Sequence, residues 1–211
     1  MVRLLSLIAT ASLALSCGQV NGDAEGCAQN TLFTTTYSMG VNDDSIGGLE
    51  IAQAILIPGT GTTKRYTRIL LPLYLGGAAF VGGTMTLSIH KDEGGSPAAE
   101  DADADVEVLQ SSTVNLNTLS STTPSLVTFD FATTTPLTVG SIYWLVLSAT
   151  YVHTSTNVVR WAGDDLARGD LGTYTSGTAK YESVLSTEGW SNINIGGGRA
   201  LGFQTECENP A

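Results

Sequence analysis

The chain has 211 residues, of which 42% are hydrophobic, only 14% are charged and 24 are glycine, and this composition favours one compact β-rich domain over a helical protein. A domain of this length buries roughly 70% of the surface that its unfolded chain exposes, so folding does not depend on disulfides or metals. The formal net charge is −11, so the chain would repel phosphate backbones, and nucleic acid is excluded as a partner.

The first 16 residues predict a secretory signal peptide. Arg3 gives a positive start, an apolar run covers residues 4–15, and small residues follow the run. The run is too short to span a bilayer as a helix, as is typical of a cleaved leader. The alternative interpretation is a buried N-terminal strand. Residues 17–30 are polar and contain Gly and Asp, which predicts a short flexible tether.

Short strand-like runs fill residues 31–211. Apolar and polar residues alternate over residues 84–90 and 127–131, which indicates strands with one buried face. Further runs cover residues 51–57, 67–75, 109–114, 142–149, 158–161, 179–183 and 200–207. Gly and Pro clusters separate these runs, and no stretch keeps a helical period. The sequence therefore predicts a single all-β domain, an antiparallel β-sandwich of jelly-roll type.

Pro72 interrupts the run at residues 67–75. Because proline has no N–H to donate, it predicts that this strand lies at an edge or has a bulge at Pro72. The strands around Leu87, Phe129 and Leu145 are expected to be the central, buried ones.

Several segments follow one another as they do in a known group of exported bacterial proteins. These segments are Glu50-Ile-Ala-Gln, Leu73-Tyr-Leu-Gly, Met85-Thr-Leu-Ser-Ile, Lys91-Asp-Glu-Gly-Gly-Ser-Pro, Leu126-Val-Thr-Phe-Asp-Phe, Pro136-Leu-Thr-Val, Tyr143-Trp-Leu-Val-Leu and Arg160-Trp-Ala-Gly. Over residues 45–205 the chain resembles choice-of-anchor domains, which are similar in build to jelly-roll carbohydrate-binding modules. The shared segments are core and turn positions, so the resemblance implies a fold more than a ligand. The acidic residues 98–106 depart from the usual short connection.

The end of the leader, Leu13-Ala-Leu-Ser-Cys17, resembles the lipobox of bacterial lipoproteins. The resemblance implies that Cys17 becomes the first residue and carries several acyl chains, which are enough for stable membrane anchoring. Gly18 follows, and the sorting rule of enterobacteria would then permit transfer to the outer membrane. We therefore expect a lipid-anchored protein of the bacterial cell envelope, at the outer membrane or the cell surface.

The chain has three cysteines. If Cys17 is acylated, Cys27 before the first strand and Cys207 at the end of the last strand remain. In an oxidising, exported setting this pair predicts a disulfide that joins the two ends of the domain. The alternative is a bridge between Cys17 and Cys27, which would leave Cys207 free.

Three acidic segments are candidate calcium sites, because calcium prefers hard oxygen ligands. The candidate ligands are Asp101, Asp103, Asp105, Asp43 and Asp44, with Asp92 and Glu93 as a further pair. Residues 101–105 space their carboxylates as the start of an EF-hand loop does, but Val106 and Ser112 stand where that loop needs Gly and Glu. The alternative is that these are solvated loop and turn residues. No other cofactor is expected.

No catalytic residues are expected, and the protein is predicted not to be an enzyme. Ser96 lies in a sequence close to a nucleophile elbow, but no helix follows it. His90 is expected on the polar face of its strand, and no nucleophile is paired in the sequence with His90 or His153.

Large aromatic side chains in Gly/Ser/Thr-rich connections are suited to stacking on sugar rings. The candidates are Trp190, Tyr181, Tyr174 and Trp161. For Trp161 and Trp144, which lie in strands, the alternative is packing in the core. We expect a non-catalytic, surface-displayed module that binds a glycan or glycoprotein. The alternative is a structural or adhesive surface lipoprotein that binds protein partners or its own copies through exposed edge strands.

Overall fold

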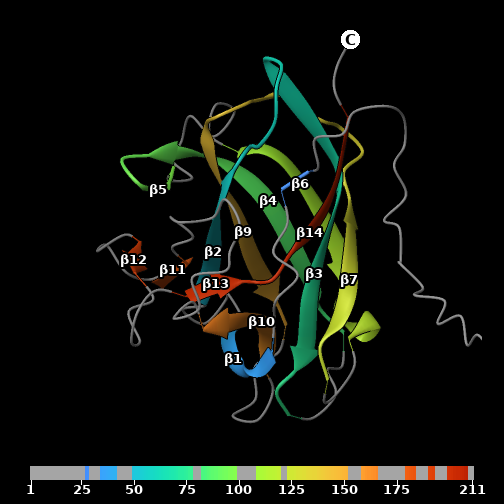
Figure 1. Cartoon of the computed structure of the whole chain (residues 1–211). Helices are drawn as coiled ribbons and strands as arrows, with labels where there is room; N and C mark the ends of the chain where they lie inside the picture. The colour runs from blue at the N-terminus through green and yellow to red at the C-terminus, as the bar shows by residue number, and fades with distance from the viewer. Residues whose placement is uncertain are drawn as a thin grey trace, which may run out of the picture.

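Two antiparallel β-sheets pack against each other in the computed structural model (Figure 1). The structure describes residues 27–28, 34–41, 49–77, 82–98, 108–119, 123–151, 158–165, 179–183, 190–192 and 199–208. The predicted all-β antiparallel sandwich is confirmed. The jelly-roll type of connection stays a prediction.

The described strands form two sheets. The first contains β1 (Thr34–Val41), β3 (Thr63–Leu75), β7 (Ser125–Asp130), β8 (Leu137–Thr138), β10 (Val159–Asp165), β13 (Arg199–Leu201) and β14 (Gln204–Glu208). The second contains β2 (Leu49–Leu56), β4 (Thr84–Glu93), β5 (Ser96–Pro97), β6 (Val108–Asn115), β9 (Ile142–Thr150), β11 (Ala179–Ser183) and β12 (Ser191–Asn192). A 3-10 turn, Leu116–Thr118, follows β6.

One hydrophobic core lies between the sheets. Ile69, Leu71 and Phe129 from the first sheet and Leu87 and Leu145 from the second have no exposed surface and belong to the same cluster. The period-two alternation explains this arrangement, because every second residue of each strand points to the same side. Each sheet therefore has an inner face in the core and an outer face.

The prediction of central strands is confirmed for two of the three. β9 pairs with β2 and β4, and β4 pairs with β9 on one side and with β6 on the other, so Leu87 and Leu145 lie in central strands. Phe129 is fully buried, but within the described residues its strand β7 pairs with β3 alone. That part of the prediction is wrong, because a side chain can be buried in the core while its strand lies at an edge.

The prediction for Pro72 is also wrong, since β3 is a central strand. It pairs with β7 on one side, and on the other with β14 as far as Leu70 and with β10 from Leu73. Pro72 lies in the break between these two partners, where a missing N–H costs least. The register shift in β3 occurs between Tyr66 and Arg68, not at the proline.

Two buried glutamines connect the sheets. In the second sheet, Gln53 Oε1 accepts a hydrogen bond of 2.6 Å from the backbone N–H of Leu201 in the first. Gln110 Nε2 donates to the carbonyl oxygen of Tyr66 over 3.0 Å, and its Oε1 accepts from the N–H of Thr135, also over 3.0 Å. Because both amides are buried and bonded, they fix the position of one sheet on the other.

The predicted disulfide is confirmed: Cys27 and Cys207 are joined, with their Cα atoms 5.8 Å apart. Next to it, the N–H of Ala28 donates to the Tyr66 hydroxyl over 3.4 Å, and the Thr205 hydroxyl donates to the Ala28 carbonyl oxygen. Burial raises the pKa of the Tyr66 phenol to about 12, although the bond from Ala28 acts in the opposite direction. The start of the domain is therefore held against β3 and β14.

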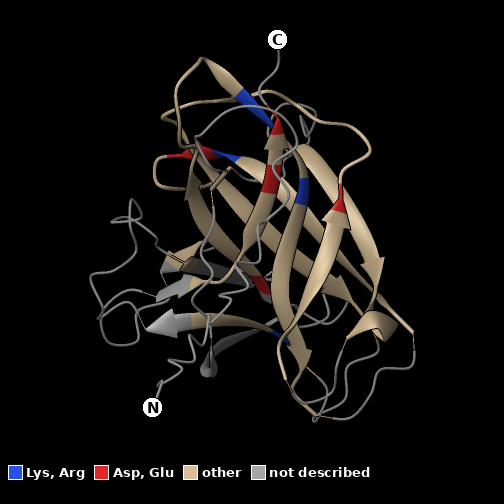
Figure 2. Cartoon of the chain, turned by 45° about the vertical axis from the view of Figure 1, so that its right-hand side comes forward, with Lys and Arg blue, Asp and Glu red and all other residues tan. Residues whose placement is uncertain are grey.

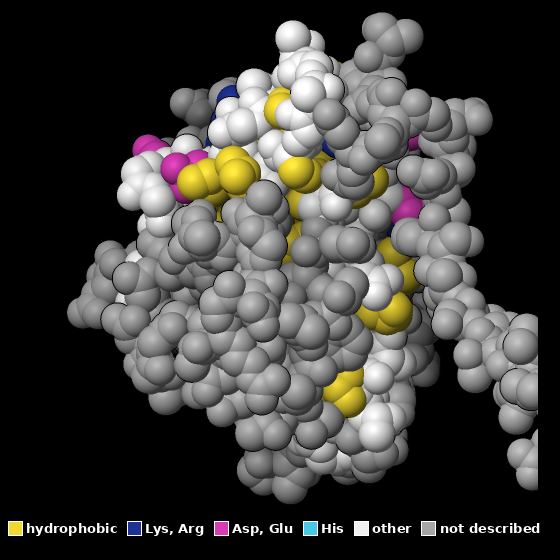
Figure 3. Space-filling view, in the orientation of Figure 1, with side chains coloured by type: hydrophobic (Ala, Val, Ile, Leu, Met, Phe, Trp, Pro, Cys, Tyr) yellow, Lys and Arg dark blue, Asp and Glu magenta, His cyan; other side chains and the backbone are white. Residues whose placement is uncertain are grey.

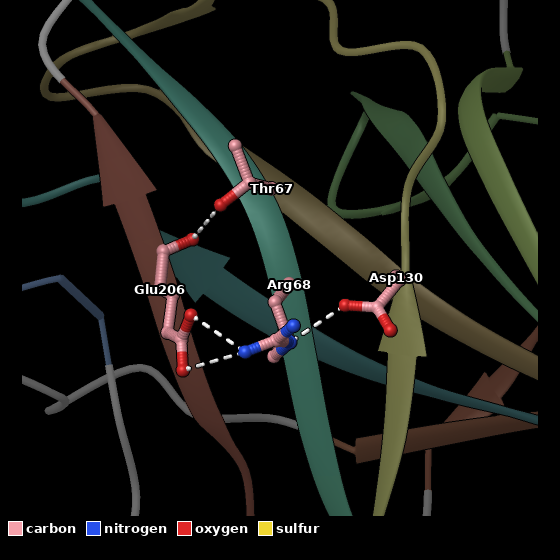
Figure 4. Close-up of polar contacts among 4 residues, drawn as sticks. All are labelled: Thr67, Arg68, Asp130 and Glu206. Atoms are coloured by element: carbon pink, nitrogen blue, oxygen red, sulfur yellow. Dashed lines mark hydrogen bonds and ion pairs between the residues drawn. The ribbon is translucent and has the colours of Figure 1, made fainter.

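Three charged side chains cross the outer face of the first sheet (Figure 4). Arg68 Nε lies 2.6 Å from Asp130 Oδ1 in β7, and Arg68 Nη1 lies 3.1 Å from Glu206 Oε2 in β14. The hydrogen bond to Asp130, followed by the negative charge of Glu206, raises the pKa of Arg68 above its usual value. Arg68 is exposed, so the cluster favours the observed register of three strands more than it adds stability.

Candidate ligand-binding face

The outer face of the second sheet has a hydrophobic cluster of its own. It consists of Ala52, Ala54, Trp144 and Val146, and we call it the outer cluster. Neighbouring residues of β9 point to opposite faces, so Trp144 and Val146 lie away from the core that Leu145 and Leu147 enter. A β-sheet with apolar residues on both faces needs something to cover each of them.

Trp144 is held in place by the β4–β5 hairpin. Its indole Nε1 donates to Asp92 Oδ1 over 2.7 Å, and Asp92 Oδ2 accepts from the N–H of Gly95 over 3.3 Å. Gly94 and Gly95 form the turn with positive φ angles of 61° and 85°, which a tight two-residue hairpin requires. The hairpin thus brings a carboxylate to the rim of the outer cluster.

Trp190 packs against the outer cluster and is half-buried. It directly precedes β12, which pairs with β11, and β11 pairs with β2 opposite Ala52. The small side chains of Ala52 and Ala54 leave space for a large ring on this side of the sheet. Of the aromatic residues predicted to bind a ligand, Trp190 is therefore the one that the structure places on this face with its side chain described.

Polar side chains continue the same face toward the other end of the strands. Those that are exposed or half-buried are Thr84, Thr86, Ser111, Thr113, Asn115, Ser148 and Thr150, which we call the polar rows. Thr86 lies between Ser148 and Thr113 in the ladders, and its hydroxyl is 2.9 Å from that of Thr113. Neighbouring strands are about 5 Å apart, and alternate residues along a strand are about 7 Å apart. The result is a regular array of hydrogen-bonding groups beside the outer cluster.

His90 lies on the outer face with the other polar residues of its strand, as predicted, but it is buried and bonded to a hydroxyl. His90 Nε2 lies 2.9 Å from Ser88 Oγ, and His90 Nδ1 lies 3.1 Å from the carbonyl oxygen of Ala98. Since a carbonyl can only accept, His90 Nδ1 carries a proton and donates to Ala98. The bond from His90 to Ala98 ties the chain after β5 to β4, which is a central strand at these positions.

Hydrophobic side chains lie at the surface beside carboxylates near the β4–β5 hairpin (Figure 3). Ile142, at the start of β9, is 37% exposed and belongs to this end of the second sheet. An apolar surface next to hydrogen-bonding groups suits an amphipathic ligand such as a sugar.

Trp161 was predicted to contact a ligand, and the structure contradicts this. Its side chain has no exposed surface, and its Nε1 donates to the carbonyl oxygen of Gly202 over 2.7 Å. β10 lies between β1 and β3, so an inward-pointing ring on it belongs to the core. Trp161 therefore packs in the core, which was the alternative interpretation of this residue.

Several other predicted residues lie outside the described part of the chain. They are Cys17, Tyr174, Asp43, Asp44, Asp101, Asp103 and Asp105. Tyr181 lies in β11 opposite Ile51, and its side chain is likewise outside the description. Among the described residues, no group of three or more His, Cys, Asp or Glu side chains could hold a metal ion. In the same part of the chain, no helix is long and apolar enough to cross a membrane.

Trp144, Asp92 and the polar rows were not predicted to share one face. A usable signal was present, because alternate residues of 142–150 place Trp144, Val146, Ser148 and Thr150 on the side opposite Leu145. The neighbours of β9 were not apparent from the sequence, since strand order depends on contacts between distant segments.

No protein-family model, curated protein or solved structure matches the chain. The resemblance to choice-of-anchor domains and to lipoproteins stays a prediction, and function has to be argued from the site itself.

Proposed function

We propose that the protein is a non-catalytic binding module, displayed at the bacterial cell surface, that recognises a glycan or glycoprotein through the outer face of its second sheet. One observation carries the proposal: Trp190 is half-buried against the outer cluster, and the polar rows extend from that cluster. A sugar ring has an apolar face that stacks on an indole and hydroxyls that pair with Ser, Thr and Asn.

Charge favours an uncharged glycan over an acidic one. The chain carries −11, and Asp92 places a carboxylate at the rim of the outer cluster. A uronate or sulfate brought to this face would meet like charge at short range. In the proposed setting, acyl chains on Cys17 and the tether of residues 17–30 hold the module at the membrane.

The test is a glycan array with the full chain, followed by titration of the best neutral glycan. Trp190→Ala should weaken binding about tenfold or more, because an aromatic contact contributes about 1 kcal/mol beyond its buried area. Trp190→Phe keeps a ring at this position and should retain most of the affinity.

The matched control is Leu126→Ala, which truncates a side chain that is 41% exposed on β7 of the first sheet. Its glycan affinity should equal that of the wild type. The proposal is wrong if Trp190→Ala melts at the wild-type temperature and binds the glycan as tightly as the wild type does.

A further inference from the structure

We infer that strand β6 is an interface for a second copy of this chain, paired antiparallel with β6 of that copy. Within the described residues, β6 pairs with β4 alone. Its ladder is unbroken from Gln110 to Asn115, opposite Ile89 to Thr84. The other side of this strand presents backbone N–H and C=O groups that another strand can pair with.

This edge lacks the features that usually prevent strands from pairing. Natural edges are protected by charge, by proline or by being short. Among the other described edges, β14 carries Glu206 and Glu208, β7 ends at Asp130, and β8 and β12 have two residues each. β1 also lacks a charge and a proline, but a register shift between Thr34 and Tyr37 interrupts its ladder with β10, and such irregularities protect an edge. β6 has eight residues and neither a charge nor a proline.

The uncharged, hydroxyl-rich composition of β6 points to a second copy of the chain as the occupant. Two chains of −11 repel each other at most contacts. The charged residues of the described strands gather mainly at the end of the sandwich near the C-terminus, away from much of the uncharged ribbon (Figure 2). A pair of β6 strands places no like charges opposite each other. Hydroxyl groups both donate and accept, so Ser and Thr pair with their own kind, as Thr86 and Thr113 already do.

The geometry restricts the pairing to a short segment. The Thr135 hydroxyl donates to the Leu109 carbonyl oxygen over 2.8 Å, so the free edge begins at Gln110. Residues opposite each other in a ladder share a face, so a two-fold axis perpendicular to the sheet must pass through a residue. An axis at Ser112 or Thr113 pairs five residues of each copy. It joins the two second sheets into one, with the polar rows continuing from one copy to the other.

Charge-swapped variants of the full chain test this pairing in sedimentation-velocity experiments over a range of concentrations. Ser111 and Thr113 are both exposed on the outer face, so charged side chains there are compatible with the fold. The variant S111K/T113K places lysines of the two copies opposite each other with either axis, and S111E/T113E does the same with glutamates. Each variant alone should sediment as a monomer of about 22 kDa, whereas the wild type forms dimers.

Mixing the two variants should restore a dimer, because unlike charges then face each other. The matched control N117K/T133K adds the same charge at exposed positions outside the strands and should dimerise like the wild type. The lysine variant also lowers the net negative charge, so non-specific repulsion would predict more association, the opposite of our expectation. A monomeric wild type, a dimeric lysine variant, a monomeric control or a mixture that stays monomeric would each overturn the inference.

Discussion

The protonation of Tyr66 is linked to folding. Its pKa is 10.0 in an exposed chain and about 12 in the fold, where burial disfavours the phenolate. Because the pKa of Tyr66 is raised in the fold, its protonated phenol contributes its full stabilisation below pH 10. This contribution is lost as the pH rises toward 12. Two units correspond to about 3 kcal/mol of unfolding free energy.

Urea unfolding just below pH 10 and near pH 12 measures this loss. Tyr66→Phe has no phenol to ionise, so the drop between the two pH values should be about 3 kcal/mol smaller than in the wild type. Equal drops in Tyr66→Phe and the wild type would show that Tyr66 is not the linked group.

At the same scale, the three tryptophans show what a sequence can and cannot predict. Trp144 and Trp161 both lie in strands, packing in the core was the alternative interpretation for both, and both are buried. Alternation cannot tell that Trp161 faces the core between the sheets and Trp144 the outer face, because that depends on how the strands pair. Trp190 lies outside any alternating run of the sequence, and only the fold shows that it packs against the outer cluster.

At the scale of elements, the start of β4 depends on Gly83. Its φ angle is +108°, and a Cβ atom there would lie 2.7 Å from the Thr150 carbonyl oxygen and 2.8 Å from Tyr151 Cβ. Gly83→Ala should therefore reduce the free energy of unfolding by about 3 kcal/mol, through backbone strain and overpacking together. Urea midpoints measure the change.

Gly82 provides a matched comparison, since its φ angle is +78° but nothing lies within 4 Å of a Cβ atom. Gly82→Ala should reduce the free energy of unfolding by about 1 kcal/mol, through backbone strain alone. If the two alanine variants were equally stable, the close approach of Gly83 to the end of β9 would not matter for folding.

Strands with strong alternation were predictable as elements, and their neighbours were not. The runs at residues 84–90 and 142–149 correspond to β4 and β9, which are central as expected. β3 misled the sequence analysis because Pro72 is acceptable in a central strand where the partner changes from β14 to β10. Such a break arises from the chain's path through the whole sheet, and no local pattern encodes it.

At the scale of the whole molecule, three contacts distant in sequence hold the two sheets and the two chain ends together. Gln53 and Gln110 connect the sheets, and the Cys27–Cys207 bond joins residues 180 positions apart. Of the three, only the disulfide could be predicted, because the expected acylation of Cys17 leaves two cysteines that can pair with each other. The glutamines lie at core-facing positions of their strands, where a sequence pattern would place an apolar residue.

The disulfide should contribute most of its stability through the unfolded chain. Closing a loop of 180 residues lowers the entropy of the unfolded state by an amount equivalent to about 5 kcal/mol in the chain-entropy model. The double variant Cys27→Ser, Cys207→Ser should lose up to this amount in urea unfolding, and the wild type with reductant should match it. Reductant should leave the double variant unchanged, which controls for other effects of the reagent. A loss below about 1 kcal/mol would mean that the bonds of Ala28 to Tyr66 and Thr205 hold the chain end without the covalent link.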